Sequence, residues 1–290
     1  MITPLRGRRR RSQWTQRLGF ALLTLSAIIT TIPIVMIIFV ILQRGLAAIT
    51  PEFLFAFPTD GLKAGGIFPA ILGTVYLTLF MTLAVAPLGI AAGVYLAHYA
   101  PATPVTRWIR VAILNLAGIP SVVYGLFGLA FFVIFMQFGT SILAGALTLA
   151  IMTLPVVITT TEEALRSVPN SFHVVSVSLG GTDWQSVRRL LLPQGLPGIL
   201  TGVILGLERA AGETAPILFT AAAVYLPRLP TSPLDPTMAL PYHLYVVSTQ
   251  VPGMPPGIQF GTAAVLLILV LAMNLIATII RSRARARRMW

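Results

Sequence analysis

Cysteine, lysine and acidic residues are scarce in this chain. It contains no cysteine, one lysine and 8 aspartates and glutamates. Without cysteine, disulfide frameworks, thiolate metal sites and thiol catalysis are excluded. The single lysine, Lys63, lies in the sequence Gly-Leu-Lys-Ala-Gly, whereas a phosphate-binding P-loop requires Gly-Lys followed by Ser or Thr. The chain therefore carries no recognisable ATPase of its own.

Charge of either sign is also scarce. Charged residues make up 10% of the 290 residues, against about 25% in an ordinary soluble domain. Hydrophobic residues make up 56%, and the mean hydropathy is +0.88. The 20 basic residues outnumber the acidic ones and give a net charge of +12. They flank long uncharged runs instead of forming a basic soluble face, which indicates a membrane protein and not a nucleic-acid-binding one.

The uncharged runs predict an all-α, polytopic membrane protein with six transmembrane helices. A helix needs about 20 apolar residues to cross about 30 Å of hydrocarbon. The predicted spans are 18–42, 67–97, two helices within 111–161 separated by a turn at 137–141, 197–222 and 258–280. Between them lie a cytoplasmic loop over 162–195 and a proline-rich external loop over 223–257, in which we expect no long helix.

The arginines predict the orientation of these helices, because cytoplasmic loops are enriched in Arg and Lys. With the N-terminus inside, sixteen basic residues fall on the cytoplasmic side and only Arg44, Lys63 and Arg228 on the other, while Arg209 lies within a span. We therefore expect both ends of the chain in the cytoplasm.

The two ends are strongly basic. The N-terminal segment 1–17 and the tail 282–290 carry most of the arginines, and the run 8–11 is expected to contact anionic lipid headgroups. The apolar stretch 18–42 has 25 uncharged residues, whereas the core of a cleaved signal peptide has about 7 to 15. We interpret it as the first transmembrane helix, retained as an anchor.

Three ionisable residues, Glu208, Arg209 and Glu213, lie near the middle of the fifth predicted span. Each costs at least about 2.5 to 3.5 kcal/mol there on insertion scales. Arg209 and Glu213 are spaced i, i+4 and are expected to pair on one helix, while Glu208 points about 100° away and needs another partner. A buried ion pair that fixes helix packing is one interpretation. We favour a substrate path, in which the planar guanidinium binds an oxyanion.

The cytoplasmic loop contains the signature of a short helix. Thr182 is followed three residues later by Gln185, which fits a capping box, and Gly180-Gly181 breaks the chain just before it. We expect a helix to begin at Thr182 and to end at Pro193.

The expected helix has an apolar stripe of Trp184, Val187 and Leu191. Such a stripe either lies in the lipid interface or fills a groove on a cytoplasmic partner, and periodicity alone leaves both open.

Gly180, Trp184 and Leu192-Pro193 resemble the EAA loop, the cytoplasmic signature of type I ABC importer membrane subunits. In that signature a Glu-Ala pair begins six residues before the glycine, but this chain has Val174-Val175 there. An acidic contact to the ATPase would therefore come from other residues. The resemblance, with this replacement, implies ATPase coupling through Gly180, Gly181, Thr182, Asp183, Trp184, Gln185, Pro193, Glu162 and Glu163.

Three further segments resemble the permease subunits of the bacterial phosphate-specific importer. Residues 118–128, Gly-Ile-Pro-Ser-Val-Val-Tyr-Gly-Leu-Phe-Gly, look like a segment that its two permease subunits share, and residues 163–169, Glu-Ala-Leu-Arg-Ser-Val-Pro, resemble both as well. Residues 209–216, Arg-Ala-Ala-Gly-Glu-Thr-Ala-Pro, resemble the PstA-type subunit in particular. Glu208 departs from the small residue expected before this segment. The resemblance covers about residues 65–281.

The resemblance implies a type I ABC importer permease fold, with a permease domain over 65–281 and with Arg209, Glu213, Thr214 and Glu208 on the substrate path. It implies a PstA-type subunit of an ATP-driven phosphate importer in the inner membrane. The partners would be a PstC-type permease, two PstB-type ATPases that bind ATP and Mg²⁺, and a PstS-type periplasmic binding protein. No cofactor, metal or catalytic residue is expected in this chain.

Other functions stay open on the residues alone. An ABC permease for sulfate, molybdate or phosphonate would use the same arginine, and a secondary transporter or channel would work without ATP. The sequence does not favour an intramembrane enzyme, because the residues for metal or acid–base catalysis are not grouped. His98, His173 and His243 lie on separate segments, and no paired aspartates accompany them. We expect each histidine to be an interfacial or loop residue.

Overall fold

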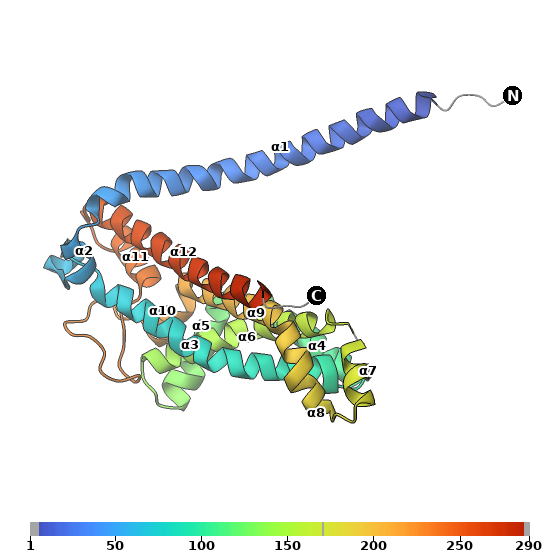
Figure 1. Ribbon diagram of the computed structural model, residues 1–290. Helices are drawn as coiled ribbons and strands as arrows, with labels where there is room; N and C mark the ends of the chain where they lie inside the picture. The colour runs from blue at the N-terminus through green and yellow to red at the C-terminus, as the bar shows by residue number, and fades with distance from the viewer. Residues whose placement is uncertain (1–5, 170, 287–290) are drawn as a thin grey trace.

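The computed structural model describes residues 6–169 and 171–286, and helices make up most of it (Figure 1). The outermost parts of the two predicted basic ends, 1–5 and 287–290, lie outside the described residues. In chain order the elements are α1 (Arg6–Gly45), η1 (Leu46–Ala48), α2 (Pro51–Phe55), β1 (Pro58–Thr59), η2 (Asp60–Leu62), β2 (Ala64–Gly65), α3 (Phe68–Val94), η3 (Tyr95–Tyr99), α4 (Pro104–Ala117), α5 (Ser121–Gly128), η4 (Leu129–Phe135), α6 (Ile142–Arg166), α7 (Ser171–Ser178), α8 (Asp183–Ser186), η5 (Val187–Leu191), α9 (Leu192–Gly212), α10 (Ala215–Thr220), α11 (Leu240–Thr249) and α12 (Pro256–Ala286).

Within the described residues, five helices are long and apolar enough to cross a membrane, and a bent pair makes a sixth candidate span. The pair consists of α4 and α5 with η4, which meet at 99°. The bend lies at Pro120, which has no N–H to continue the helix and disfavours helical geometry in the residue before it. The six predicted spans are thus present, one of them broken. The turn predicted at 137–141 is confirmed, since η4 ends at Phe135 and α6 begins at Ile142.

The fifth span begins much earlier than predicted. Helical structure runs without interruption from Asp183 to Gly212, so the expectation that Pro193 ends the short cytoplasmic helix is wrong. Pro193 lies in the first turn of α9, directly after the π-helical turn η5. The π-helical turn before it accommodates the proline inside a continuous helix, because a local π adjustment compensates for the backbone N–H that proline lacks.

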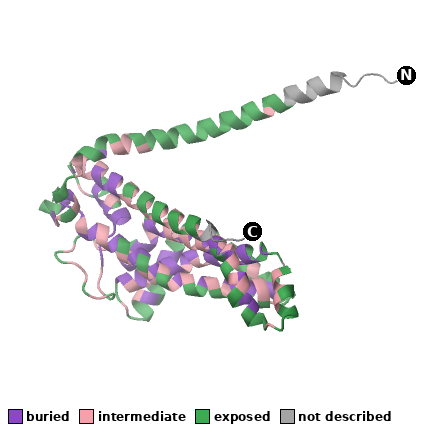
Figure 2. Ribbon diagram, viewed as in Figure 1, coloured by how far each residue is buried: buried purple, intermediate pink, exposed green. Residues whose placement is uncertain are grey.

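Glycines let α6 pack closely on both of its neighbours. A Cβ added at Gly93 of α3 would lie 2.5 Å from Thr161 Cβ, and one added at Gly202 of α9 would lie 2.8 Å from Thr160 Cβ. Contacts between small residues are the usual means by which membrane helices approach. Figure 2 shows the result: buried residues gather around α6, while the described part of α1 is exposed along most of its length.

The predicted external loop 223–257 is more ordered than a plain loop. It contains α11, a ten-residue helix with Pro241 in its first turn. Before it, the Asp235 carboxylate accepts hydrogen bonds from the amides of Thr231 (2.8 Å) and Ser232 (3.0 Å), and these bonds hold the pKa of Asp235 below its usual value.

His243 of α11 is 2% exposed, so the expectation of an interfacial or loop histidine is wrong. Among the described residues, neither of its ring nitrogens has a hydrogen-bond partner, and burial lowers its pKa to about 4.

Gly202→Ala should destabilise the bundle, because its Cβ would overlap Thr160. Overpacking of this kind costs about 1–3 kcal/mol, so the apparent unfolding temperature in detergent should fall. Gly19→Ala is the matched control, since nothing lies within 4 Å of a Cβ at Gly19. Equal melting temperatures for the two variants would contradict close packing of α6 on α9.

His243 should make stability depend on pH. In the unfolded chain it binds a proton below its ordinary pKa of 6.5, but in the folded chain only below about 4, so stability decreases as the pH falls through this window. The change from pH 7 to pH 5 is about 2 kcal/mol. His243→Phe, which keeps an aromatic ring, should remove this part of the pH dependence in denaturation measurements. An unchanged pH profile would rule out the buried neutral imidazole.

Candidate functional site

The residues of the predicted substrate path lie at a break between two helices. α9 ends at Gly212, Glu213 is extended (φ −76°, ψ 133°), and α10 begins at Ala215. The expectation of one helix over 197–222 is therefore wrong. The physical reason is Pro216, which has no N–H to donate to the carbonyl of Gly212 and whose ring would clash with it in a continuous helix. A glycine four residues before a proline was the signal in the sequence.

Arg209 and Glu213 pair across the last turn of α9, as predicted. Arg209 Nε lies 3.7 Å from Glu213 Oε1, and the two side chains are 36% and 19% exposed. This distance is too long for a hydrogen bond. Within the part of the chain that the structure describes, no hydrogen bond engages the Arg209 guanidinium, so its N–H donors remain available to an anion.

Two motifs that are far apart in the sequence meet at this break. A Cβ at Gly125 of α5 would lie 3.0 Å from the carbonyl oxygen of Ala215 and 3.0 Å from Cα of Pro216. On the same helix, Tyr124 donates a hydrogen bond of 2.7 Å to the Leu116 carbonyl, across the bend between α4 and α5. The segments 118–128 and 209–216 thus form one site.

The other two predicted path residues lie beside this pair. Glu208 is partly exposed, and among the described residues it makes no ion pair, so the partner that we expected for it is not in this part of the chain. Thr214 is the residue before α10, and its carbonyl accepts the Leu218 N–H at 3.1 Å. Their roles on a substrate path remain predictions.

The capping box in the cytoplasmic loop is confirmed. Thr182 Oγ1 accepts from the Gln185 amide (3.3 Å), and Gln185 Oε1 accepts from the Thr182 amide (3.1 Å). Gly180 has φ +79°, a conformation that favours glycine. Gly181 lies between Gly180 and Thr182, in the turn that connects α7 to α8.

The apolar stripe of this helix is divided, which sequence periodicity did not predict. Val187 and Leu191 are buried against Leu165 and neighbouring residues, whereas Trp184 is 57% exposed. Exposed apolar residues on α7 and directly after it, among them Val174 and Leu179, add to the apolar surface that Trp184 presents. This surface, which we call the α7–α8 surface, fits a partner protein or lipid.

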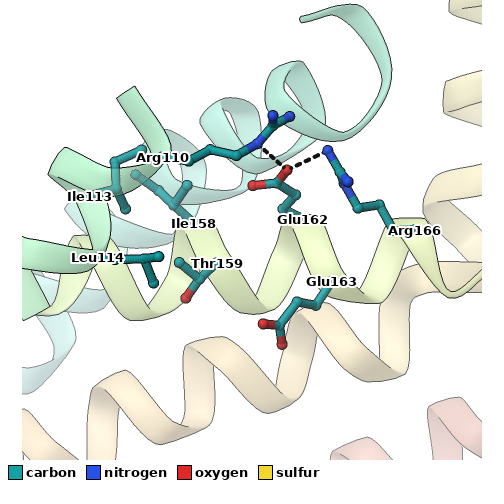
Figure 3. A pocket seen from close by; sticks show the side chains of 8 residues that line it. All are labelled: Arg110, Ile113, Leu114, Ile158, Thr159, Glu162, Glu163 and Arg166. Atoms are coloured by element: carbon teal, nitrogen blue, oxygen red, sulfur yellow. Dashed lines mark hydrogen bonds and ion pairs between the residues drawn. The ribbon is translucent and has the colours of Figure 1, made fainter. Parts of the chain in front are cut away.

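Glu162 and Glu163, both candidates for ATPase coupling, differ completely in environment. Glu163 is exposed. Glu162 is 8% exposed and accepts from Arg110 Nε at 2.7 Å, while Arg166 Nη2 lies 2.9 Å from the same oxygen (Figure 3). Arg110 also donates to the Leu96 carbonyl at 2.8 Å. Glu162 thus joins α4 and α6 and is not available for a direct contact outside the chain.

This arrangement borders a cavity near the C-terminal end of α6. The cavity has a volume of about 220 Å³ and is lined by Arg110, Ile113, Leu114, Ile158, Thr159, Glu162, Glu163 and Arg166 (Figure 3). Glu162 and Arg166 lie four residues apart on α6, a spacing that brings two side chains together, and they form an ion pair. The sequence did not predict Arg110, which lies 52 residues away.

Two of the three histidines are brought together, against expectation. The rings of His98 and His173 have centroids 4.9 Å apart, and Asp183 lies beside them. Their positions in the sequence, on separate segments, gave no sign of this contact.

Glu162→Gln should loosen the contact between α4 and the C-terminal end of α6. The amide keeps the shape but removes the charge that Arg110 and Arg166 share, and a partly buried charged group that loses its partner costs about 1–3 kcal/mol. Thermal unfolding in detergent measures this cost. Glu163→Gln, on the same turn but exposed, should leave stability within about 0.5 kcal/mol. A larger loss for Glu163→Gln than for Glu162→Gln would refute the assigned network.

Residues 87–287 match the family of the binding-protein-dependent transport system inner membrane component. The similar curated proteins include the probable phosphate transport system permease protein PstA of Methanocaldococcus jannaschii, which is 38% identical over 252 residues, or 86% of each chain. Phosphate transport system permease protein PstA 1 of Mycobacterium tuberculosis is 32% identical over 268 residues, which cover 91% of this chain and 87% of the relative.

Solved structures show the same fold. The bacterial ABC transporter involved in the import of the acidic polysaccharide alginate matches with a TM-score of 0.67 at 15% identity, over 95% of this chain and 99% of that chain. The MetNI methionine ABC transporter matches with a TM-score of 0.61 at 18% identity, over 74% of this chain and 94% of that chain. The fold is that of an ABC importer permease, as predicted.

The family consists of multi-pass inner membrane transport components and not of enzymes, and its members work with an ATPase and a substrate-binding protein. The broken helices, the arginine in the last turn of α9 and the exposed α7–α8 surface are consistent with such a component. This chain belongs to the family of binding-protein-dependent transport system inner membrane components.

Proposed function

We propose that this chain is the PstA-type permease subunit of an ATP-driven phosphate importer. The observation that carries the proposal is Arg209, a guanidinium without a close hydrogen-bond partner among the described residues, at a helix break inside a membrane domain. Two relatives at 32% and 38% identity bear the names of phosphate permeases, which supports the choice of anion.

The chemistry at the break suits phosphate. A guanidinium offers paired, parallel N–H donors that match two phosphate oxygens. Glu213, 3.7 Å from Arg209 Nε, partly neutralises the arginine while no substrate is bound, and its loose contact leaves room for an anion to displace it. The ion pair thereby lowers the cost of holding a charge within the membrane without blocking the donors.

The acidic residues also favour phosphate over sulfate. Phosphate at neutral pH keeps at least one O–H group, which donates a hydrogen bond to a carboxylate, whereas sulfate has none. Glu213 and Glu208, both partly exposed beside Arg209, are suitable acceptors. A carboxylate facing fully ionised sulfate would be left unpaired and repelled, and such a mismatch discriminates strongly between ligands.

The break itself fits a transport path. Backbone groups that no longer pair within a helix are tolerated in a membrane only where protein or a water-filled cavity surrounds them. Transporters commonly place substrate sites at such discontinuous helices. We infer that the break between α9 and α10, packed on the bend between α4 and α5, lines the path through the membrane.

The proposal also assigns the partners. A PstC-type permease would complete the path, and a PstS-type periplasmic protein would deliver phosphate. Two PstB-type ATPases would bind ATP and Mg²⁺, and one of them would dock on the α7–α8 surface, which includes Trp184.

The orientation that we propose has both ends of the chain in the cytoplasm. The distribution of arginines supports it, and so does the end of α12, which lies at the same end of the molecule as α7 and α8 (Figure 1). A sixth, broken span makes the number of crossings even.

Arg209→Gln should reduce ATP-dependent phosphate uptake at least tenfold in vesicles that contain the assembled importer, because loss of a charged donor costs about 1.5–3 kcal/mol. Arg209→Lys should retain part of the uptake, since it keeps the charge but not the planar donor pair. Arg283→Gln, at the exposed end of α12, is the matched control and should transport normally.

Two further measurements complete this test. Co-purification of an ATPase with each variant shows that the importer has assembled, so that normal uptake by an assembled Arg209→Gln importer would refute the substrate path. Competition by sulfate, molybdate and phosphonate identifies the anion, and competition by sulfate as strong as by phosphate would refute phosphate selectivity.

A further inference from the structure

His98, His173 and Asp183 form a cluster at the junction between the membrane helices and the cytoplasmic segment. His98 lies in η3, the last turn that continues α3, His173 lies in α7, and Asp183 is the first residue of α8. One ligand atom from each lies within 4.8 Å of the others. The two imidazole rings meet edge to face, with centroids 4.9 Å apart. The cluster is separate from the substrate path at Arg209.

The position of His173 is determined by a buried hydroxyl. Its Nδ1 lies 3.1 Å from Ser186 Oγ, and Ser186 is completely buried. With the proton on Nδ1, the ring donates to Ser186 and directs the lone pair of Nε2 toward Asp183, whose Oδ1 is 3.8 Å away. A metal-binding histidine commonly has its second ring nitrogen held in this way.

The distances are close to those of a tetrahedral site. With metal–ligand bonds of about 2.0–2.2 Å, the ligand atoms lie about 3.4 Å apart. The three atoms, now within 4.8 Å of one another, therefore need to approach by at most about 1.4 Å, which side-chain rotation provides. Two imidazoles and one carboxylate, with a fourth position open to water, are typical of zinc coordination.

The surroundings have room for an ion and do not repel it strongly. Both histidines line a cavity of about 180 Å³. The charged group that lines it with them is Arg166, whose guanidinium is paired with Glu162 at 2.9 Å. Asp183 therefore supplies negative charge that this arginine does not cancel. Imidazole ligands favour zinc, nickel and cobalt over magnesium and calcium.

We propose that His98, His173 and Asp183 bind a divalent transition-metal ion such as Zn²⁺. The ion links the helical turn after α3 to α7 and α8. Its outermost ligands, His98 and Asp183, are 85 positions apart in the sequence. It would hold the α7–α8 surface in a fixed position relative to the membrane helices. The site is independent of the transported anion and does not rest on the proposed function.

The test is direct metal binding to the full-length chain purified in detergent and stripped with a chelator. Competition with a chromophoric chelator should give one Zn²⁺ per wild-type chain. His98→Ala and His173→Ala should each weaken binding at least tenfold, since loss of a supporting residue alone costs about 10–100-fold. Asp183→Asn should also weaken it, and Glu163→Gln, which removes an exposed carboxylate outside the cluster, should not.

X-ray absorption of the Zn²⁺-loaded chain gives a second, independent measurement. Wild type should show two imidazole ligands, and Asp183→Asn should keep both, which tests the site even where a histidine variant folds poorly. The double variant His98→Ala/His173→Ala leaves His243 as the one remaining histidine and should show no imidazole. The proposal is overturned if wild type binds no Zn²⁺, or if the double variant binds it as tightly as wild type.

Discussion

The structure depends on the requirement that backbone polar groups inside a membrane be paired or shielded. Pro120 and Pro216 each remove a helix donor: Pro120 lies at the bend of a broken candidate span, and Pro216 lies just after the candidate span that ends at Gly212. The two interruptions pack against each other, because Gly125 has no side chain and lets α5 approach the backbone of Ala215 and Pro216. Each break thereby shields the other from lipid. The one arginine within the predicted fifth span, Arg209, lies directly before the second break, where a polar path is possible.

A different arrangement holds together the helix ends that lie near α7 and α8. The Leu96 carbonyl, in the last turn of the α3 span, accepts from Arg110, and Arg110 shares the carboxylate of Glu162 with Arg166. One buried acid therefore joins η3, α4 and α6 where helix ends leave backbone carbonyls without partners. The two charged clusters therefore differ. Glu162 is closely paired with two arginines where it holds the helices together, whereas Arg209 and Glu213 lie 3.7 Å apart where we propose that an anion binds.

Local signals in the sequence were reliable wherever neighbouring residues decide the outcome. The capping box of Thr182 and Gln185 and the turn near Gly139 were both predicted and are both present. The errors came from reading apolar runs as straight helices. Hydropathy predicts where a span lies, but it does not predict the effect of a proline within it. The helix breaks just before Pro216, whereas it continues through Pro193.

The sequence by itself determined the membrane class, the six candidate spans, the family motifs and the charged residues within the fifth span, because composition and short spacings carry that information. Only the tertiary structure decided which distant residues meet: Arg110 with Glu162, Gly125 with Pro216, and His98 with His173. The physical reason is that small residues set how closely helices approach, and that approach, not the order of residues along the chain, determines which side chains share a site.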